Sequence, residues 1–333
     1  MKCWADSSEG LEHAVEALLA GLLVGMPTET VYGLAGNALD ETVVASIFAA
    51  KQRPTFDPLI VHTASPEQAF ELASAVPCGA EVLAERFWPG PLTLVLPRRK
   101  GLPDLLSAGL DTLALRVPSH PLAHQLLVQS GLALAAPSAN RFGHISPTTA
   151  QHVMEELGHV PEVAGVLDAG PCEVGVESTV IGFPGEGRVV VYRLGATPLE
   201  ELREVVEEVE WVRGSDRDSQ SDRVQKGEQS PGMLDRHYAP RTPMLLLERG
   251  EPAPADVGAT GWLFFDSAVN VEGPREFLSE KGDLREAATR LFACMRRLDG
   301  RSMERIVAWK VPDQGLGRAI NDRLTRAAAL ISE

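Results

Sequence analysis

The chain has 333 residues, of which 44% are hydrophobic and 23% are charged, and its formal net charge is -15. At roughly 150 residues per domain this length predicts two domains, and the composition is that of a folded protein, which excludes an intrinsically disordered one. An acidic surface repels a polyphosphate backbone, so we expect no direct, stable nucleic-acid binding. A small anion such as ATP needs only a few well-placed cations.

The N-terminus and the cysteines predict a cytoplasmic protein. The first ten residues lack the pattern of a signal peptide, and the apolar stretch at 17–26 is too short to span a bilayer. The cysteines are widely spaced, with no C-x-x-C pair that would indicate a zinc site or a redox motif. We therefore expect buried thiols of a reducing compartment at Cys3, Cys78, Cys172 and Cys294.

Four apolar runs predict buried strands in the first part of the chain. They are GLLVGMP, LTLVLP, TLALRVP and LALAAP, which end at Pro27, Pro97, Pro118 and Pro137. Proline cannot donate to a sheet ladder, so each strand should stop there. The pattern leaves open whether the sheet is parallel or mixed. Ligands of open α/β sheets collect at the carboxyl ends of strands, so the loops after these runs are where we expect chemistry.

Helix starts lie between the predicted strands. The sequences SPEQ at 65–68 and TPLE at 197–200 each combine a capping hydroxyl, a proline at the first helical position and a Gln or Glu three residues after the hydroxyl. Ser146-Pro147 repeats the first half of this signal. Strands alternating with helices predict an α/β sheet domain over residues 1–212.

The second half of the chain predicts a linker and a smaller domain. Residues 213–241 are polar and charged, with few aliphatic side chains, which is typical of a linker. Beyond it, MLLLE, GWLFFD and IVAWKVP predict strands. The spacing of apolar residues predicts helices over 284–298 and from about 318 to 330, which completes an α/β domain at 242–333. GLGRAI at 315–320 is an incomplete G-x-G-x-x-G fingerprint and does not predict nucleotide binding.

Polar side chains at the ends of the apolar runs are candidates for a site. They are Thr28, Glu29, Thr30, Ser138, Asn140, Ser146, Glu177, Ser178 and Thr179. Turn chemistry and helix capping produce the same patterns, so both interpretations stay open here. No Walker A, H-E-x-x-H or G-x-S-x-G motif is present, which excludes the common nucleotide hydrolases, metalloproteases and serine hydrolases. His120 and His124 have helical spacing without a nearby carboxylate pattern, which favours ordinary surface histidines over a metal pair.

A few basic residues stand out in this acidic chain. Lys51, Arg53 and His62 lie close together in KQRPTFDPLIVH, where a solvated helix end is the competing interpretation. Arg116 ends the apolar run TLALR, and a buried arginine is costly unless it reaches a carboxylate or a phosphate. Arg193 follows another apolar run, VVVY. The position of Arg116 favours a function in binding.

Six segments, in order and spacing, resemble the YrdC-type family of L-threonylcarbamoyladenylate synthases. They are PTETVYGL, KQRPTFDPLIVH, FWPGPLTLVLP, LALRVPSHP, PSANRFGHISPT and GVESTVIGF. SPGMLDRHYAP at 230–240, followed by the smaller domain, is similar to the long two-domain form of that family. The resemblance implies a twisted open α/β sheet with a concave cavity, and a Rossmann-like C-terminal domain joined by a linker that closes over the cavity. The linker departs from the commoner SPGMKYRHYAP at Leu234 and Asp235.

The resemblance also implies the reaction and its residues. L-threonine, bicarbonate and ATP would give L-threonylcarbamoyl-AMP, pyrophosphate and water, the first step towards N6-threonylcarbamoyladenosine in tRNA. Threonine would be held by Thr30, His62, Arg116, Ala136 and Ser178. ATP would be held by Arg53, Asp57, Thr112, Ser138, Asn140, Ser146, Arg193 and Tyr238. Lys51 and Arg53 would catalyse by positioning and by charge, with Mg²⁺ as the expected cofactor and no metal ligand assigned to the protein.

Two other functions compete with this reaction. A YrdC-like paralogue could be a non-catalytic RNA- or ribosome-associated protein, but the acidic charge and the complete linker and second domain disfavour it. A carbamoyl-transfer enzyme of hydrogenase maturation would need zinc-finger cysteines and an acylphosphatase-like region, which the sequence does not show. The family further implies that the adenylate passes to a separate threonylcarbamoyl transferase complex, with no membrane involved.

Overall fold

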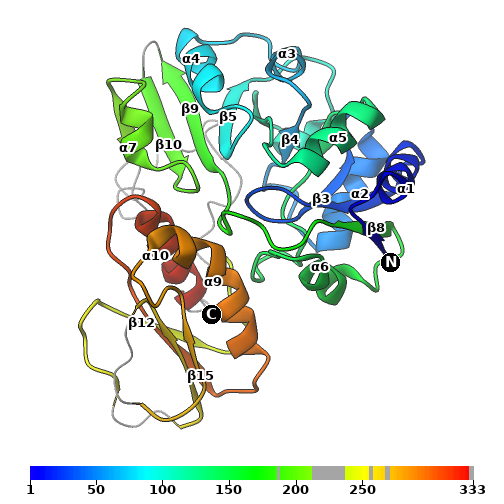
Figure 1. Ribbon diagram of the computed structural model, residues 1–333. Coiled ribbons are helices and arrows are strands. Elements are labelled where there is room, and N and C mark those ends of the chain that lie inside the picture. The colour runs from blue at the N-terminus through cyan, green and yellow to red at the C-terminus, as the bar shows by residue number, and fades with distance from the viewer. Residues whose placement is uncertain (186–187, 212–236, 255–257, 267–270, 330–333) are drawn as a thin grey trace.

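The computed structural model describes residues 1–185, 188–211, 237–254, 258–266 and 271–329, which form a larger N-terminal and a smaller C-terminal body (Figure 1). The strands of the larger body are β1 (Lys2–Ala5), β2 (Leu23–Met26), β3 (Gly33–Asn37), β4 (Ile60–His62), β5 (Leu92–Pro97), β6 (Thr112–Arg116), β7 (Leu134–Ala135), β8 (Val163–Asp168), β9 (Thr179–Gly185), β10 (Arg188–Arg193) and β11 (Val209–Trp211). Its helices are α1 (Ser8–Leu19), α2 (Glu41–Lys51), α3 (Pro66–Phe70), α4 (Cys78–Phe87), the 3-10 helix η1 (Asp104–Ser107), α5 (Pro121–Ser130), α6 (Ala150–Leu157) and α7 (Leu199–Arg203). The smaller body contains β12 (Met244–Leu247), β13 (Thr260–Phe264), β14 (Arg275–Phe277), α9 (Leu284–Asp299), β15 (Arg305–Trp309) and α10 (Leu316–Ala328).

The larger body is built on one mixed sheet. Its 11 strands run in the order β1-β8-β2-β3-β7-β4-β6-β5-β9-β10-β11. The sheet contains both parallel pairs, such as β4 with β6, and antiparallel pairs, such as β5 with β6, which settles the strand direction that the sequence left open. The four strands of the smaller body, in the order β12-β15-β13-β14, are all parallel. The predicted class, an α/β sheet domain followed by a smaller α/β domain, is confirmed.

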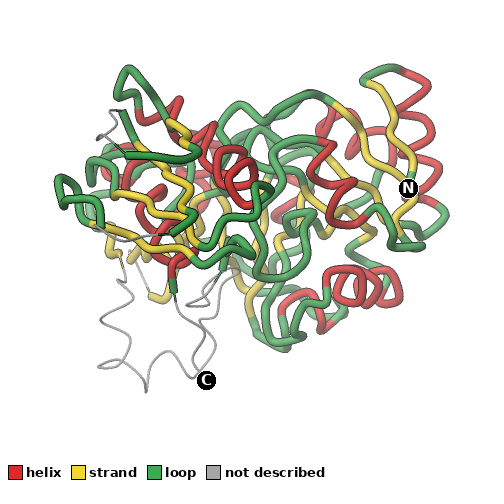
Figure 2. The backbone as a smooth tube through the Cα atoms, turned by 90° about the horizontal axis from the view of Figure 1, so that it is seen from below, coloured by secondary structure: helices red, strands yellow, loops and turns green. Residues whose placement is uncertain are grey.

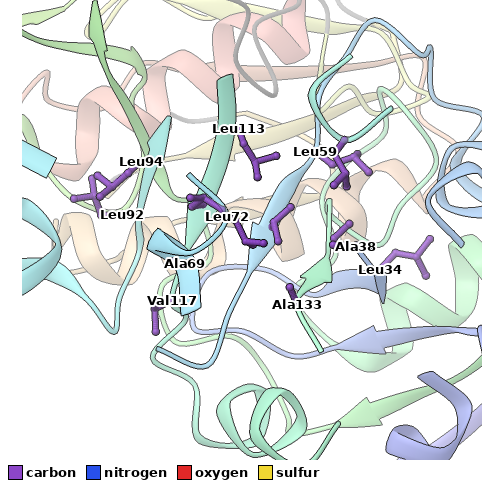
Figure 3. Packing of buried hydrophobic residues seen from close by; sticks show 14 of the residues in the cluster. Leu34, Ala38, Leu59, Ala69, Leu72, Leu92, Leu94, Leu113, Val117 and Ala133 are labelled. Carbon is purple, nitrogen blue, oxygen red and sulfur yellow. The ribbon is translucent and has the colours of Figure 1, made fainter. Parts of the chain in front are cut away.

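All four proline-terminated runs form strands. Pro27, Pro118 and Pro137 lie just beyond β2, β6 and β7, while Pro97 is the last residue of β5. Side chains of these strands are packed between the sheet and its helices, as the close view of Leu92, Leu94 and Leu113 shows (Figure 3). The prolines therefore mark the ends of the regular strands, although an isolated backbone bridge follows Pro97 (Arg98 with Ala73) and another follows Pro137 (Ser138 with Gly33).

The predicted helix starts are only partly right. Ser65 caps α3 by accepting a hydrogen bond from the Gln68 amide, as predicted. Thr197 does not cap α7, because its hydroxyl donates to the Pro91 carbonyl oxygen and the helix begins after Pro198. Ser146 is likewise no cap. In both segments the hydroxyl forms a hydrogen bond with a residue distant in the sequence, so it is not available to cap the helix.

The predicted elements of the smaller domain are present. MLLLE, GWLFFD and IVAWKVP contain β12, β13 and β15, and the apolar spacings give α9 and α10. GLGRAI forms the start of α10, where a side chain at Gly317 would lie 1.9 Å from the Pro312 carbonyl oxygen. Close backbone packing thus requires that glycine.

Helices α9 and α10 pack between the four-stranded sheet and the larger body (Figure 1). The perpendicular view in Figure 2 shows the two bodies side by side. One apolar cluster joins them, because Val31, Ile145, Val176 and Tyr238 pack with residues of α9 and α10. Burial of this apolar surface holds the smaller body against the larger one.

The prediction that all four cysteines are buried is wrong for two of them. Cys172 and Cys294 are buried, whereas Cys3 and Cys78 are exposed. Cys3 lies on the edge strand β1, which pairs only with β8, and Cys78 is the first residue of α4. Among the described residues, no helix has both the length and the apolar surface that crossing a membrane would require.

Candidate functional site

A cavity of about 580 Å³, counting its open mouth, lies where several loops and strand ends of the larger body meet residues 237–238. It is lined by Thr28, Thr30, Val31, Gly33, Arg53, Pro58, Ile60, His62, Arg116, Ala136, Pro137, Ser138, Glu177, Ser178, Arg193, His237 and Tyr238. Nine residues predicted for the site are among them: Thr30, Arg53, His62, Arg116, Ala136, Ser138, Ser178, Arg193 and Tyr238. Of the loops after the proline-terminated strands, those after β2 and β7 line the cavity, whereas the loops after β5 and β6 contribute no lining residue, and Arg116 reaches the cavity from the end of β6 itself.

The loop after β2 is a tight turn that also presents polar groups. The Thr28 hydroxyl donates to the Val31 carbonyl oxygen at 2.6 Å and accepts from two backbone amides of the turn. This turn aims Glu29 and Thr30 at Arg116, whose Nη2 lies 2.6 Å from Glu29 Oε1 and whose Nη1 lies 3.0 Å from Thr30 Oγ1. The sequence left open whether these polar residues only form a turn or also face a site. They do both, since Thr28 forms the turn and Thr30 lines the cavity.

Arg53 enters the cavity from the segment after α2. Its guanidinium forms a salt bridge with Asp57 at 2.9 Å and donates to the carbonyl oxygens of Asp57 and Pro58. Burial lowers the pKa of Arg53, and the Asp57 carboxylate opposes that shift. Asp57, which the sequence assigned to ATP, does not line the cavity but holds Arg53 in place.

Lys51 lies behind the cavity wall. Its side chain is 1% exposed, and its Nζ donates to the carbonyl oxygens of Ser138 at 2.5 Å and Asn140 at 2.6 Å. Burial, and after it the charge of Arg53, lowers the pKa of Lys51 well below its usual range. The structure thus gives Lys51 two backbone partners in the loop after β7, and the catalytic role that the resemblance implies for it stays a prediction.

Three further predicted residues also lie outside the cavity lining. Asn140 is buried and its amide donates to the Arg141 and His144 carbonyl oxygens. Ser146 is buried and its hydroxyl donates to Glu177 at 2.5 Å. Thr112 is half-buried at the start of β6, the opposite end of that strand from Arg116. Asn140 and Ser146 support the wall, and Thr112 is about 13 Å along the strand from Arg116.

Two hydroxyls and a guanidinium form the wall near β9 and β10. Arg193 donates to the Ser178 carbonyl oxygen at 2.9 Å and to its hydroxyl at 3.1 Å. The same hydroxyl lies 2.8 Å from Thr93 Oγ1. Ser178 is therefore held from both sides, which fixes the direction of its hydroxyl before any ligand binds.

Both histidines of the cavity are neutral near pH 7. Burial and the charge of Arg116 lower the pKa of His62 to about 3. Burial, with Arg53 and Lys51 nearby, lowers the pKa of His237 well below its usual range. Neutral rings contribute no charge to the cavity, so the positive charges in its lining are those of Arg53, Arg116 and Arg193. His120, by contrast, lies at the start of α5 and accepts from the Leu122 amide.

The segment that leads into the smaller body closes one side of the cavity. Residues 213–236 of the predicted linker lie outside the described residues, and so do Leu234 and Asp235. Tyr238 is buried with φ of 62°, and its ring stacks on Phe292 of α9 with centroids 5.7 Å apart. This left-handed backbone conformation is strained for a tyrosine, and packing from both bodies keeps it there.

Sequence reasoning missed two features of the wall. Glu177 was a candidate without a role, yet it lines the cavity and binds Ser146. Arg323 was not a candidate at all, although its Nε lies 2.8 Å from Glu177 Oε2. The missed signal is spacing, since Ile320, Arg323 and Leu324 share the buried face of α10.

Two family models match this chain. The model described as telomere recombination matches residues 16–195. The model described as threonylcarbamoyl-AMP synthase, C-terminal domain, matches residues 197–329. Together they cover both bodies, and the second match includes α9 and α10.

Curated relatives and a solved structure are similar over nearly the whole length. A Pyrococcus abyssi protein named threonylcarbamoyl-AMP synthase is 40% identical over 92% of this chain and 91% of its own length. A Bacillus subtilis protein of the same name is 38% identical over 96% of this chain and 92% of its own length. The crystal structure of Pyrococcus abyssi Sua5 complexed with L-threonine superimposes with a TM-score of 0.86 at 36% identity, covering 98% of this chain and 97% of that one.

Proposed function

The chain belongs to the threonylcarbamoyl-AMP synthase family in its two-domain form, and we propose that its cavity holds L-threonine beside ATP and joins them through a carbamate made from bicarbonate. The observation that carries this proposal is the convergence of three guanidinium groups and three hydroxyl side chains on one cavity: Arg53, Arg116, Arg193, Thr30, Ser138 and Ser178. The threonine amine attacks bicarbonate with loss of water, the carbamate oxygen attacks the α-phosphate of ATP, and pyrophosphate leaves. The described cavity offers no activated nucleophile, so catalysis is positioning and charge stabilisation.

We assign the threonine end of the cavity to Arg116 and its neighbours. A guanidinium has five N–H donors, and Arg116 uses three of them on Gly90, Glu29 and Thr30. The remaining two can receive the carboxylate of the amino acid. Neutral acceptors for its amine and hydroxyl come from Thr30, Ser178 and the unprotonated ring of His62, with Ala136 against its methyl group.

We assign the ATP end to Arg53, Ser138, Arg193 and Tyr238. The two arginines supply the charge that phosphates need. The Tyr238 hydroxyl is buried and has no hydrogen-bond partner among the described residues, a need that a nucleotide group would satisfy. Asp57, Asn140, Ser146 and Lys51 support this end from behind the wall, and the assignment of Thr112 stays a prediction from the resemblance.

ATP chemistry implies Mg²⁺, and the chain offers it few ligands. The described residues contain no cluster of three or more His, Cys, Asp or Glu side chains that could hold an ion. Mg²⁺ commonly keeps several waters and binds substrate phosphates, so phosphate oxygens and water would supply most of its coordination. Bound there, the ion would neutralise phosphate charge. The protein groups above position the substrates.

We also propose a cytoplasmic location and delivery of the adenylate to a separate threonylcarbamoyl transferase complex. The product contains a mixed anhydride that water hydrolyses, so a cavity closed by Tyr238 protects it until transfer. The linker over 213–241 is proposed to close this site, as the resemblance implies, and only its last residues are described.

Pyrophosphate release tests the proposed function. The full chain is incubated with ATP, Mg²⁺, L-threonine and bicarbonate, and pyrophosphate is measured as each component is omitted. We expect release that needs both threonine and bicarbonate. Pyrophosphate release that ignores threonine, or none with all components present, would sink the proposal.

A further inference from the structure

One side chain of the smaller body reaches the wall of the cavity in the larger body. Arg323 of α10 is 0% exposed. Its Nε lies 2.8 Å from Glu177 Oε2, its Nη2 lies 2.9 Å from the Leu194 carbonyl oxygen, and its Nη1 lies 2.6 Å from Asp322 Oδ2. Its Cζ lies 4.9 Å above the ring of Tyr238. Arg323 therefore contacts the cavity wall on two sides.

Glu177, the partner of Arg323, is an acidic residue in the wall of the cavity that we assign to ATP, which is itself strongly negative. Glu177 lines the cavity, is 6% exposed and uses its other oxygen to accept from Ser146. A carboxylate in such a place repels phosphate, and low solvent access strengthens the repulsion. Burial lowers the pKa of Arg323, but Tyr238 and then the carboxylates of Glu177 and Asp322 outweigh it and raise the pKa, so the positive charge of Arg323 persists at every ordinary pH.

We propose that Arg323 is a positioning residue of the smaller domain, which neutralises Glu177 so that the cavity accepts the triphosphate of ATP. The identity of this anion rests on the proposed function. Because Arg323 comes from α10, the ATP end is electrostatically complete only when the two bodies are docked. The smaller domain thus contributes charge balance to the site as well as packing against Tyr238.

The test compares four variants of the full chain: Arg323→Gln, Arg323→Lys, Glu177→Gln and the double variant Arg323→Gln/Glu177→Gln. Arg318→Gln is the matched control, since Arg318 also joins α10 to the larger body, through the more exposed Glu200. The readouts are the KM values for ATP and threonine, kcat, and the Kd of ATP by calorimetry. Thermal melting checks that each variant is folded.

We expect Arg323→Gln to raise the KM and the Kd for ATP by about 30-fold or more, the usual effect of leaving one buried charge unpaired. The KM for threonine should rise much less, because the zwitterion has no net charge. The double variant should return both ATP constants to within about threefold of the parent, since the repelling carboxylate is gone. Arg318→Gln breaks a partly exposed ion pair, so it should stay within about threefold. Glu177→Gln alone removes the repelling acid and keeps the cation, so it should not raise the Kd for ATP.

A double variant as impaired as Arg323→Gln would overturn the proposal, because a packing role cannot be rescued by removing the acid. If Arg323→Gln does not fold, the ATP Kd of Arg323→Lys tests the proposal instead. This variant retains the charge, so the proposal expects an ATP Kd within about fivefold of the parent, and a rise of tenfold or more contradicts it. The binding readout needs no turnover. A parent that binds ATP but makes no adenylate would therefore refute the proposed function while leaving this comparison valid.

Discussion

The substitution Lys51→Met separates two roles for this lysine. If Lys51 met a phosphate, as the sequence suggests, its loss would lower turnover and leave the fold intact. In the structure its Nζ donates to the Ser138 and Asn140 carbonyl oxygens and the side chain is 1% exposed. Each buried acceptor that loses its donor costs about 1–3 kcal/mol, so two cost about 2–6 kcal/mol, partly offset because no buried amine has to be desolvated.

The assay is urea unfolding followed by circular dichroism, with kcat measured in parallel. We expect Lys51→Met to lower the free energy of unfolding by about 2 kcal/mol or more and also to lower kcat, because the loop after β7 carries Ser138. Lys100→Met is the control, since Lys100 is exposed. A Lys51→Met protein as stable as the parent but far slower would refute the supporting role and restore the phosphate contact.

Three further outcomes are expected. Arg116→Lys keeps a positive charge for Glu29 but loses the fork, so it should raise the KM for threonine roughly tenfold and the KM for ATP much less; equal effects on both, in steady-state kinetics, would contradict this assignment. His62 has a pKa of about 3 in the folded protein against 6.5 in the unfolded chain, so between these values only the unfolded chain binds the proton. Below pH 6.5 the free energy of unfolding of the parent should therefore fall by about 1.4 kcal/mol more per pH unit than that of His62→Gln. Urea unfolding at pH 7, 6 and 5 measures both pH dependences, and equal dependences in the two proteins would count against the buried neutral histidine. Serine should react more slowly than threonine by roughly 10- to 200-fold and valine more slowly still, because a lost hydroxyl leaves buried partners unpaired; comparable rates for valine and threonine would exclude a hydroxyl-reading pocket.

Local sequence chemistry predicted much of the fold, because a proline has no amide hydrogen to donate to a sheet ladder and so lies at or just beyond the ends of these strands. The same kind of argument placed Arg116 correctly in a buried, paired position, since the cost of burying an arginine depends little on the details of the fold. The predicted helix caps are wrong where the hydroxyl forms a hydrogen bond with a distant residue. Ser146 binds Glu177, and Thr197 binds Pro91, over separations that no local pattern encodes.

The parts of the site that sequence reasoning missed depend on contacts between distant segments. Arg323 and Glu177 are separated by 146 residues, so no local sequence pattern around either residue indicates the contact. A usable signal did exist. Arg323 follows Ile320 on the apolar face of α10, and Lys51 follows Ile47 on the apolar face of α2, where a charged residue must find a buried partner.

The most direct test of the central claim is detection of the adenylate itself. The full chain is incubated with ATP, Mg²⁺, L-threonine and ¹³C-bicarbonate, and the products are separated rapidly and analysed by mass spectrometry. The account predicts a species with the mass of L-threonylcarbamoyl-AMP that contains one ¹³C atom and forms in step with pyrophosphate. Pyrophosphate accompanied only by unlabelled AMP or by threonyl-AMP would contradict it.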